Sequence, residues 1–165
     1  MNRKQFKQNL EKGKEWEELF YLDLKNRLSK SVTIIDNRNF YRDEKNRKIP
    51  DFTLIDSVKN KTVYYDAKSK SYYYTKNDLD EYVSLFTMDV SFVDSYRSIS
   101  AETGSPVYIS FWDKKKDKEH YYVLDVNQKE YDTYSYDNEF TINNRISYRW
   151  NIEDLKKIKI SVDMS

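Results

Sequence analysis

Two short motifs near the middle of this 165-residue chain have the residue types and spacing needed to hydrolyse a phosphodiester bond. Asp66-Ala67-Lys68 follows Pro50-Asp51 by fifteen residues, which places two carboxylates and an ammonium group on adjacent predicted strands. Carboxylates that lie close together repel each other, so they favour a bound cation. Mg²⁺ takes few protein carboxylates and completes its shell with water and phosphate oxygens. We therefore expect a Mg²⁺ site, with Mn²⁺ as a substitute, at which Asp51 and Asp66 are ligands. Lys68 would position or activate the attacking water and stabilise developing charge.

The elements around these motifs read as a β-hairpin. Residues 62–72 are rich in β-branched and aromatic side chains, which predicts a strand with two alternating faces. One face carries Tyr64, Asp66, Lys68 and Lys70 toward a cleft or solvent, and the other carries Val63, Tyr65 and Ala67 toward a helix. Residues 49–55 form the preceding predicted strand, with Pro50 at its start, where a missing N–H is tolerated. A short turn at residues 57–61 would then bring Asp51 within reach of Asp66.

At these residues the chain resembles the PD-(D/E)XK nuclease superfamily, whose motif reads here as Pro50-Asp51 and then Asp66-Ala67-Lys68. Many members, notably archaeal-type Holliday junction resolvases and some restriction endonucleases, also carry a glutamate on the first helix, often in a Gly-x-x-aromatic-Glu context. That context reads here as Gly13-Lys14-Glu15-Trp16-Glu17. No clear glutamine follows Lys68 as it does in the exonuclease branch, so a processive exonuclease is not implied.

The resemblance covers about residues 10–112 and implies a fold as well as an activity. The expected fold is an α/β (α+β) restriction endonuclease-like core, a central mixed β-sheet flanked by helices. We expect a single domain over residues 1–165, with its core at about 10–126. Because cutting two strands needs two sites, the resemblance also implies a homodimer, for which the aromatic-rich C-terminal half could supply the interface.

Three glutamates compete for the helix position, and helical geometry ranks them. Each residue advances the helix by about 100°, so Glu17 lies about 100° from Trp16, while Glu18 lies at about 200° and Glu15 at about 260°. Only Glu17 falls inside the apolar stripe formed by Leu10, Trp16, Phe20, Leu24 and Leu28. A carboxylate on a core-facing stripe is costly unless it is paired or bound to metal, so Glu17 is the predicted third ligand. The alternative is a carboxylate at the edge of the stripe that bends out to water.

Composition limits which other sites are possible. The chain has no cysteine and a single histidine, His120, so neither disulfides nor a zinc site is expected, and a metal must be held by oxygen. Charged residues make up 35% of the chain, but aromatic residues make up 16% and supply enough buried area for a globular domain. No apolar run approaches the roughly 20 residues that span a bilayer, and the N-terminus lacks the apolar core of a signal peptide. We expect an intracellular, cytoplasmic protein without membrane partners.

The net charge of +1 hides an uneven distribution along the sequence. Residues 1–49 carry 13 Lys and Arg against 8 Asp and Glu, whereas residues 71–113 carry 2 against 7. A basic N-terminal third could hold a nucleic-acid backbone, DNA more readily than RNA, although a solvated first helix explains the charge equally well. The candidate contact loop is residues 37–48, with Arg38, Arg42, Lys45, Arg47 and Lys48. Lys70 and the tyrosines at 72–74, including Tyr73, are further candidates, the alternatives being a solvent-facing lysine and half-buried packing residues.

The rest of the chain is predicted more coarsely. A helix, either continuous or broken near Met88, is expected from residues 75–78 to about residue 99, with Thr75 or Asn77 as its N-cap and a core face of Leu79, Tyr82, Val83, Phe86 and Val90. Residues 107–112 and 120–126 alternate as strands, and the lysines between them form either a solvated loop or a phosphate contact. Residues 127–150 resemble short strands or an irregular excursion, before a short helix that begins at residues 151–155.

Three functions are compatible with these residues. The first is a metal-dependent DNA endonuclease of restriction or junction-resolving type. The second is an RNA-cutting or toxin-like nuclease with the same site, which the sequence does not separate from the first. The third is a non-catalytic nucleic-acid-binding module on the same fold, which the presence of all four site residues disfavours.

Overall fold

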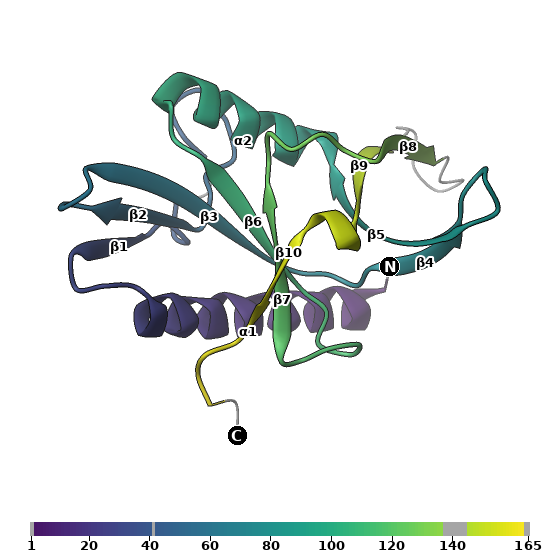
Figure 1. Ribbon diagram of the computed structural model, residues 1–165, viewed down its shortest axis with the longest axis horizontal. Helices are drawn as coiled ribbons and strands as arrows, with labels where there is room; N and C mark the ends of the chain where they lie inside the picture. The colour runs from purple at the N-terminus through teal and green to yellow at the C-terminus, as the bar shows by residue number, and fades with distance from the viewer. Residues whose placement is uncertain (1, 41, 137–144, 164–165) are drawn as a thin grey trace.

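The chain forms a central six-stranded mixed sheet with a helix on each side and a smaller second sheet (Figure 1). The computed structural model describes residues 2–40, 42–136 and 145–163. In spatial order, the strands of the central sheet are β1 (Val32–Asp36), β2 (Phe52–Asp56), β3 (Lys61–Ser69), β6 (Val107–Trp112), β7 (His120–Asp125) and β10 (Lys156–Lys159). β3 and β6 run parallel, and every other neighbouring pair is antiparallel. The predicted fold class, a mixed sheet flanked by helices, is confirmed.

Helix α1 (Arg3–Arg27) covers one face of the central sheet. Asn2 caps its first turn by accepting a hydrogen bond from the Gln5 backbone N–H at 2.8 Å. Trp16, Phe20 and Leu24 pack on the sheet residues Phe52 and Ala67. Burying a side chain such as Phe20 contributes about 1.5–3 kcal/mol, so this stripe fixes α1 across β2 and β3.

The apolar stripe of α1 is shorter than the sequence predicts. Leu10 is 51% exposed, whereas Trp16 is fully buried, with its ring stacked at 5.1 Å on Trp112. The N-terminal turns of α1 therefore extend beyond the packed part of the sheet.

The opposite face of the central sheet packs against helix α2 (Val90–Thr103) and the second sheet. The second sheet has the order β4 (Tyr73–Lys76), β5 (Tyr82–Asp89), β9 (Arg145–Asn151) and β8 (Asp132–Tyr136), all antiparallel. Val93, Phe86 and Trp150 meet the central-sheet residues Ile109 and Phe111 in this second core. Helix α2 ends at Gly104, whose φ of 69° is the left-handed conformation that glycine adopts without strain.

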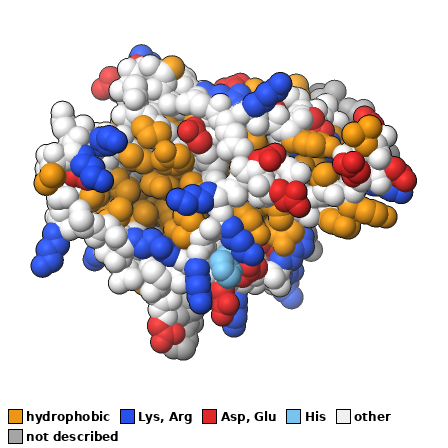
Figure 2. Space-filling view, in the orientation of Figure 1, with side chains coloured by type: hydrophobic (Ala, Val, Ile, Leu, Met, Phe, Trp, Pro, Cys, Tyr) orange, Lys and Arg blue, Asp and Glu red, His pale blue; other side chains and the backbone are white. Residues whose placement is uncertain are grey.

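The predicted helix of residues 75–99 is wrong in its first part, and only the part after the break near Met88 is helical, as α2. β4 and β5 occupy the first part of that segment as a hairpin, and the helix begins only at Val90. Asn77 accepts hydrogen bonds from the N–H groups of Leu79 and Glu81, but it stabilises the hairpin turn rather than a helix. Leu79 is 76% exposed at the tip instead of in the core. Figure 2 shows hydrophobic and acidic side chains together at this end of the molecule.

The C-terminal third contributes more to the fold than its sequence suggests. The strands predicted at 107–112 and 120–126 are confirmed as β6 and β7, and the short terminal helix is a 3₁₀ turn, η1 (Ile152–Asp154), capped by Asn151. The strand β10, which the sequence analysis does not predict, follows it and pairs with β7. The hydrophobic cores accordingly extend past residue 126, to Leu155 and Ile160.

Residues 137–144, which belong to the predicted excursion at residues 127–150, lie outside the described residues. None of the described helices is both long enough and apolar enough to cross a membrane.

Candidate active site

The β2–β3 hairpin places Asp51 beside Asp66 of β3. Phe52 pairs with Tyr65, so Asp51, immediately before β2, lies next to Asp66. The Ala67 backbone N–H donates a hydrogen bond to Asp51 Oδ2 at 2.9 Å, which fixes this carboxylate. Local alternation also holds in β3, because Val63, Tyr65 and Ala67 pack beneath α1. The hairpin and the alternation of β3 are therefore as the sequence predicts, but the face expected toward a cleft or solvent is largely covered, because Asp66 is buried and Tyr64 packs against the second core.

Asp66 is a buried carboxylate with an unsatisfied oxygen. Its side chain is 1% exposed, and its Oδ2 atom is the one buried side-chain N or O among the described residues that lacks a hydrogen-bond partner. Lys68 Nζ lies 3.1 Å from this oxygen and forms an ion pair with it. An unsatisfied buried carboxylate oxygen is costly, and a ligand that supplies positive charge would remove that cost.

Burial and the Asp66 carboxylate together change the ionisation of Asp51. Burial is the larger cause and the negative charge of Asp66 is the second, and they raise the pKa of Asp51 to about 9. Lys68 and the Ala67 N–H oppose this shift without cancelling it. In the absence of a cation, Asp51 therefore holds a proton well above the pH at which an ordinary aspartic acid loses one.

Lys68 is held as an ammonium group. Burial acts to lower its pKa, but the carboxylates of Asp66, Asp51 and Glu17 together outweigh burial and raise that pKa above the ordinary lysine value. A charged lysine can orient a water or stabilise a negative charge, but it cannot accept a proton. In the metal-free protein Lys68 is therefore suited to charge stabilisation rather than to the role of a base.

Of the three candidate glutamates on α1, Glu15, Glu17 and Glu18, only Glu17 is turned toward the site. Glu15 pairs with Lys114 at 2.6 Å, and Glu18 pairs with Arg38 at 2.6 Å, both at the surface. Glu17 is half-buried, and burial raises its pKa while the charges of Arg38, Lys68 and Asp66 act on it. The position of Glu17 agrees with the ranking from helical geometry.

The donor set can be compared with what a metal requires. Among the described residues, no three His, Cys, Asp or Glu side chains are close enough together to hold a metal ion, so the three-ligand set with Glu17 stays a prediction. Asp51 and Asp66 remain as two adjacent oxygen donors. Asp66 has an oxygen without a hydrogen-bond partner, and Asp51 has a raised pKa. Two carboxylates with water and substrate oxygens are an ordinary Mg²⁺ ligand set, so the residues present fit this ion.

The loop predicted to contact DNA is largely occupied by internal ion pairs. Arg38 pairs with Asp36 and Glu18, and Arg47 pairs with Asp43 and Glu102. The remaining candidates of this loop make other contacts: Lys45 pairs with Glu102, Arg42 donates to the Asn46 carbonyl, and the Lys48 ammonium lies 2.9 Å from the centre of the Phe92 ring. Most of the charge of residues 37–48 is thus balanced within the protein.

Phe92 is a site neighbour that the sequence analysis does not find. From the first turn of α2, its ring lies under the ammonium groups of both Lys48 and Lys68, the latter at 4.8 Å. The face of the ring attracts both ammonium groups, and burial lowers the pKa of Lys48. An apolar residue in a predicted helix carries no sequence signal for this role.

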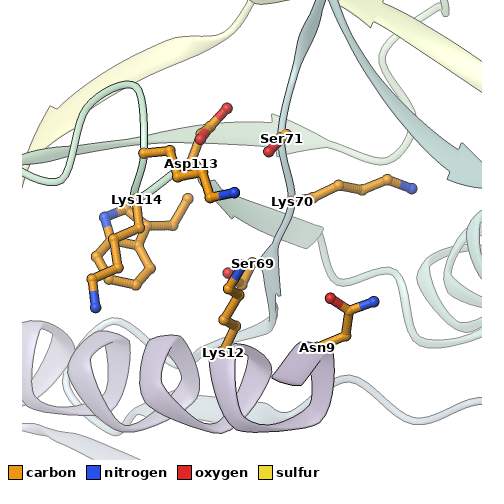
Figure 3. Close-up of a pocket in the computed structure, with 9 residues that line it drawn as sticks. Asn9, Lys12, Ser69, Lys70, Ser71, Asp113 and Lys114 are labelled. Atoms are coloured by element: carbon orange, nitrogen blue, oxygen red, sulfur yellow. The ribbon is translucent and has the colours of Figure 1, made fainter. Parts of the chain in front are cut away.

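The two candidates beyond Lys68 have different surroundings. Lys70 lines a pocket of about 660 Å³ at the end of β3 (Figure 3), and burial lowers its pKa. Tyr73 belongs to the second sheet, where its hydroxyl accepts a hydrogen bond from Arg149 at 2.8 Å. The Tyr73 hydroxyl therefore has a structural partner, whereas Lys70 faces open space next to the site.

Replacement of Glu17 by glutamine tests the assignment of the helix carboxylate. We expect Glu17→Gln to weaken Mg²⁺ binding by roughly 10- to 100-fold, because it removes a negative charge that acts on the Asp51–Asp66 pair. Isothermal titration with Mn²⁺ measures the effect, with Glu18→Gln as the matched control on the same helix. A larger loss in the Glu18 variant would show that the helix presents a different residue to the metal.

Comparisons with known proteins support the fold but do not establish the function. No protein-family model matches the sequence, and no curated protein matches it. Among solved structures, Hjc, a Holliday junction resolvase of the archaeal hyperthermophile Archaeoglobus fulgidus, is similar with a TM-score of 0.50 and 10% sequence identity. The match covers 85% of this chain and 84% of that chain. The chain therefore has a restriction endonuclease-like fold of the kind seen in Hjc, and at this identity the likeness establishes the fold alone.

Proposed function

We propose that this protein is a metal-dependent DNA endonuclease that hydrolyses phosphodiester bonds, of restriction or junction-resolving type. The observation that carries the proposal is the unsatisfied Asp66 oxygen, buried beside Asp51 and 3.1 Å from the Lys68 ammonium. A structural core would not be expected to keep two repelling carboxylates together, whereas a metal-dependent phosphodiesterase requires them. The fold shared with a Holliday junction resolvase supports the same conclusion.

Each residue of the site has a separate task in this mechanism. Asp51 and Asp66 would hold Mg²⁺, which when bound polarises the scissile phosphate and lowers the pKa of a coordinated water. The Ala67 N–H keeps Asp51 in place. The Lys68 ammonium stabilises the negative charge that develops on the phosphate, and it orients the attacking water. Glu17 adds a third negative charge on the α1 side.

A homodimer follows from this proposal because each site cuts one strand. The second sheet is a candidate interface, since it carries exposed apolar side chains such as Tyr82, 61% exposed, and Ile146, 49% exposed. The partner is DNA in preference to RNA.

Cleavage of a substrate panel tests the function. We expect labelled DNA to be cut in Mg²⁺ or Mn²⁺ and to stay intact in EDTA, with linear duplex, single strand, four-way junction and RNA compared side by side. Ca²⁺ should support binding without turnover, because it is a weaker activator of water than Mg²⁺.

The other outcomes of this panel distinguish the alternatives. Metal-dependent cutting of RNA but not DNA would make the protein a ribonuclease with the same site. Tight binding without cutting in any metal would make it a non-catalytic module, and efficient cleavage in Ca²⁺ alone would contradict the mechanism.

A further inference from the structure

The pocket at the end of β3 is built from three separate parts of the chain (Figure 3). Helix α1 contributes Asn9 and Lys12, the exit of β3 contributes residues 69–71, and the segment that follows β6 contributes residues 112–115. In Figure 3, Lys12 rises from α1 toward Ser69, while the side chains of Lys70 and Lys114 extend to opposite sides of β3. The pocket begins one residue after Lys68, so anything bound there lies next to the candidate active site.

The charge of this pocket is positive and mostly uncompensated. Of its four lysines, Lys114 pairs with Glu15, whereas Lys12, Lys70 and Lys115 make no ion pair within 4 Å in the described part of the chain. Its one acid, Asp113, is buried and accepts hydrogen bonds from the N–H groups of Tyr72 and Lys116. The acid thus holds the loop together and leaves the lysines available for an anion.

Lys70 is the strongest indication that the pocket binds an anion. It is half-buried, burial lowers its pKa, and the Asp89 carboxylate acts on it only from beyond ion-pair distance. A partly buried ammonium without a counter-ion is unfavourable unless a ligand supplies the negative charge. Lys70 lies two residues after Lys68, about 7 Å further along the chain. That distance is comparable with the spacing of neighbouring phosphates along a nucleic-acid strand.

The aromatic residue of the pocket does not offer a stacking surface for a base. Trp112 is 2% exposed, its ring stacks on Trp16, and its Nε1–H donates to the Lys118 carbonyl. The groups left to contact a ligand are ammonium, hydroxyl and amide groups, including Ser69 and Ser71. Such groups bind phosphate oxygens without reading sequence.

Other surfaces of the protein suit a polyanion less well. In the loop of residues 37–48, Arg38, Lys45 and Arg47 are already paired with carboxylates. The β4–β5 turn is apolar at Leu79, but Asp78, Asp80 and Glu81 surround it with negative charge.

We infer that this pocket binds the phosphates adjacent to the scissile one, with Lys70 nearest the cut and Lys12 and Lys115 further along the same strand. This inference rests on the proposed nuclease function and adds the path of the substrate backbone. It makes the sugar-phosphate backbone, rather than the bases, the ligand of the pocket, so binding there is independent of sequence.

Binding in EDTA tests the pocket without any cleavage. Fluorescence anisotropy of a labelled duplex and a four-way junction, at several salt concentrations, gives the slope of log K against log salt. Each lost phosphate contact lowers the magnitude of that slope by about 0.7–0.9, so Lys12→Ala with Lys115→Ala should lower it by about 1.4–1.8. Lys70→Ala should lower it by about 0.7–0.9. Replacing Lys12 and Lys115 by arginine should retain the slope.

The matched control removes two lysines from the opposite end of β3. Lys59 and Lys61 are exposed and make no ion pair within 4 Å in the described residues, so the double alanine variant should bind like the wild type. An unchanged slope in the pocket variants, with a reduced slope after Lys45→Ala and Arg47→Ala, would overturn the inference in favour of the 37–48 loop. Absence of any binding would also overturn it.

The same data separate this inference from the proposed activity. If the pocket variants lose salt dependence but no metal supports cleavage, the pocket stands and the nuclease proposal fails. If the protein cleaves DNA while the pocket variants bind normally, the nuclease stands and the pocket assignment fails.

Discussion

Lys68→Ala is expected to lower the rate of metal-dependent cleavage by roughly 10²- to 10³-fold while the protein still folds. The Lys68 ammonium is the positive group closest to the buried Asp66 oxygen, at 3.1 Å, and the carboxylates around it keep it charged. A charge that is already fixed in place stabilises the phosphate as it becomes more negative, without reorganisation during the reaction. Alanine removes this charge and leaves the two carboxylates uncompensated.

Single-turnover cleavage at saturating enzyme measures this effect, because it separates the chemical step from binding. Circular dichroism and the melting temperature establish that the variant is folded. Lys61→Ala is the matched control, since Lys61 is an exposed lysine at the other end of the same strand. Asp66→Ala should abolish cleavage as well. Normal turnover in either the Lys68 or the Asp66 variant would remove the proposed site.

Asp51→Asn is expected to stabilise the metal-free protein at neutral pH and to abolish its stabilisation by Mg²⁺. Asparagine keeps the size of the side chain and an oxygen that can accept the Ala67 N–H, and it removes the cost of protonating Asp51, which burial and the Asp66 carboxylate impose on the folded protein at neutral pH. A gain of about 1–2 kcal/mol would raise the melting temperature by roughly 2–8 °C for a chain of this length. In the wild type, Mg²⁺ at 100 times its dissociation constant should add about 2.7 kcal/mol.

The pH dependence of the same variant follows from the raised pKa of Asp51. The folded protein keeps this proton up to about pH 9, whereas the unfolded chain loses it near 3.8, the ordinary pKa of an aspartic acid. Between these values the folded state binds more protons, so the contribution of Asp51 to stability is fully present below about pH 3.8 and is lost as the pH rises toward 9. Asp51→Asn should remove this part of the decline, and its advantage over the wild type should grow with pH.

Differential scanning fluorimetry from pH 5 to 9, in EDTA and in Mg²⁺, measures both effects. Asp78→Asn provides the control, because it makes the same chemical change at an exposed position on the β4–β5 turn. An Asp51→Asn protein that melts at a lower temperature than the wild type in EDTA would show that protonating Asp51 in the fold carries no such cost.

Local sequence patterns predict those features of the candidate site that depend on neighbours along the chain. Alternation in β3 separates Asp66 and Lys68 from Ala67, and a turn of four residues places Asp51 beside Asp66. Helical geometry likewise distinguishes Glu17 from Glu15 and Glu18, because the angle between residues of a helix is fixed by its backbone.

The strand pairings, the ion pairs and the pocket depend on residues remote in sequence, so they appear only in the folded chain. The segment Tyr82–Asp89 fits a helical pattern, but it becomes a strand because Leu85 pairs with Asn151, so hydrogen bonds to β9 override its local preference. The charges of Arg38 and Arg47 read as available for DNA, yet Glu18 on α1 and Glu102 on α2 compensate them. The pocket beyond Lys68 exists only because α1, β3 and the segment after β6 meet there. Local patterns constrain backbone conformation, whereas the pairing of strands and charges depends on which distant segments the folded chain brings into contact.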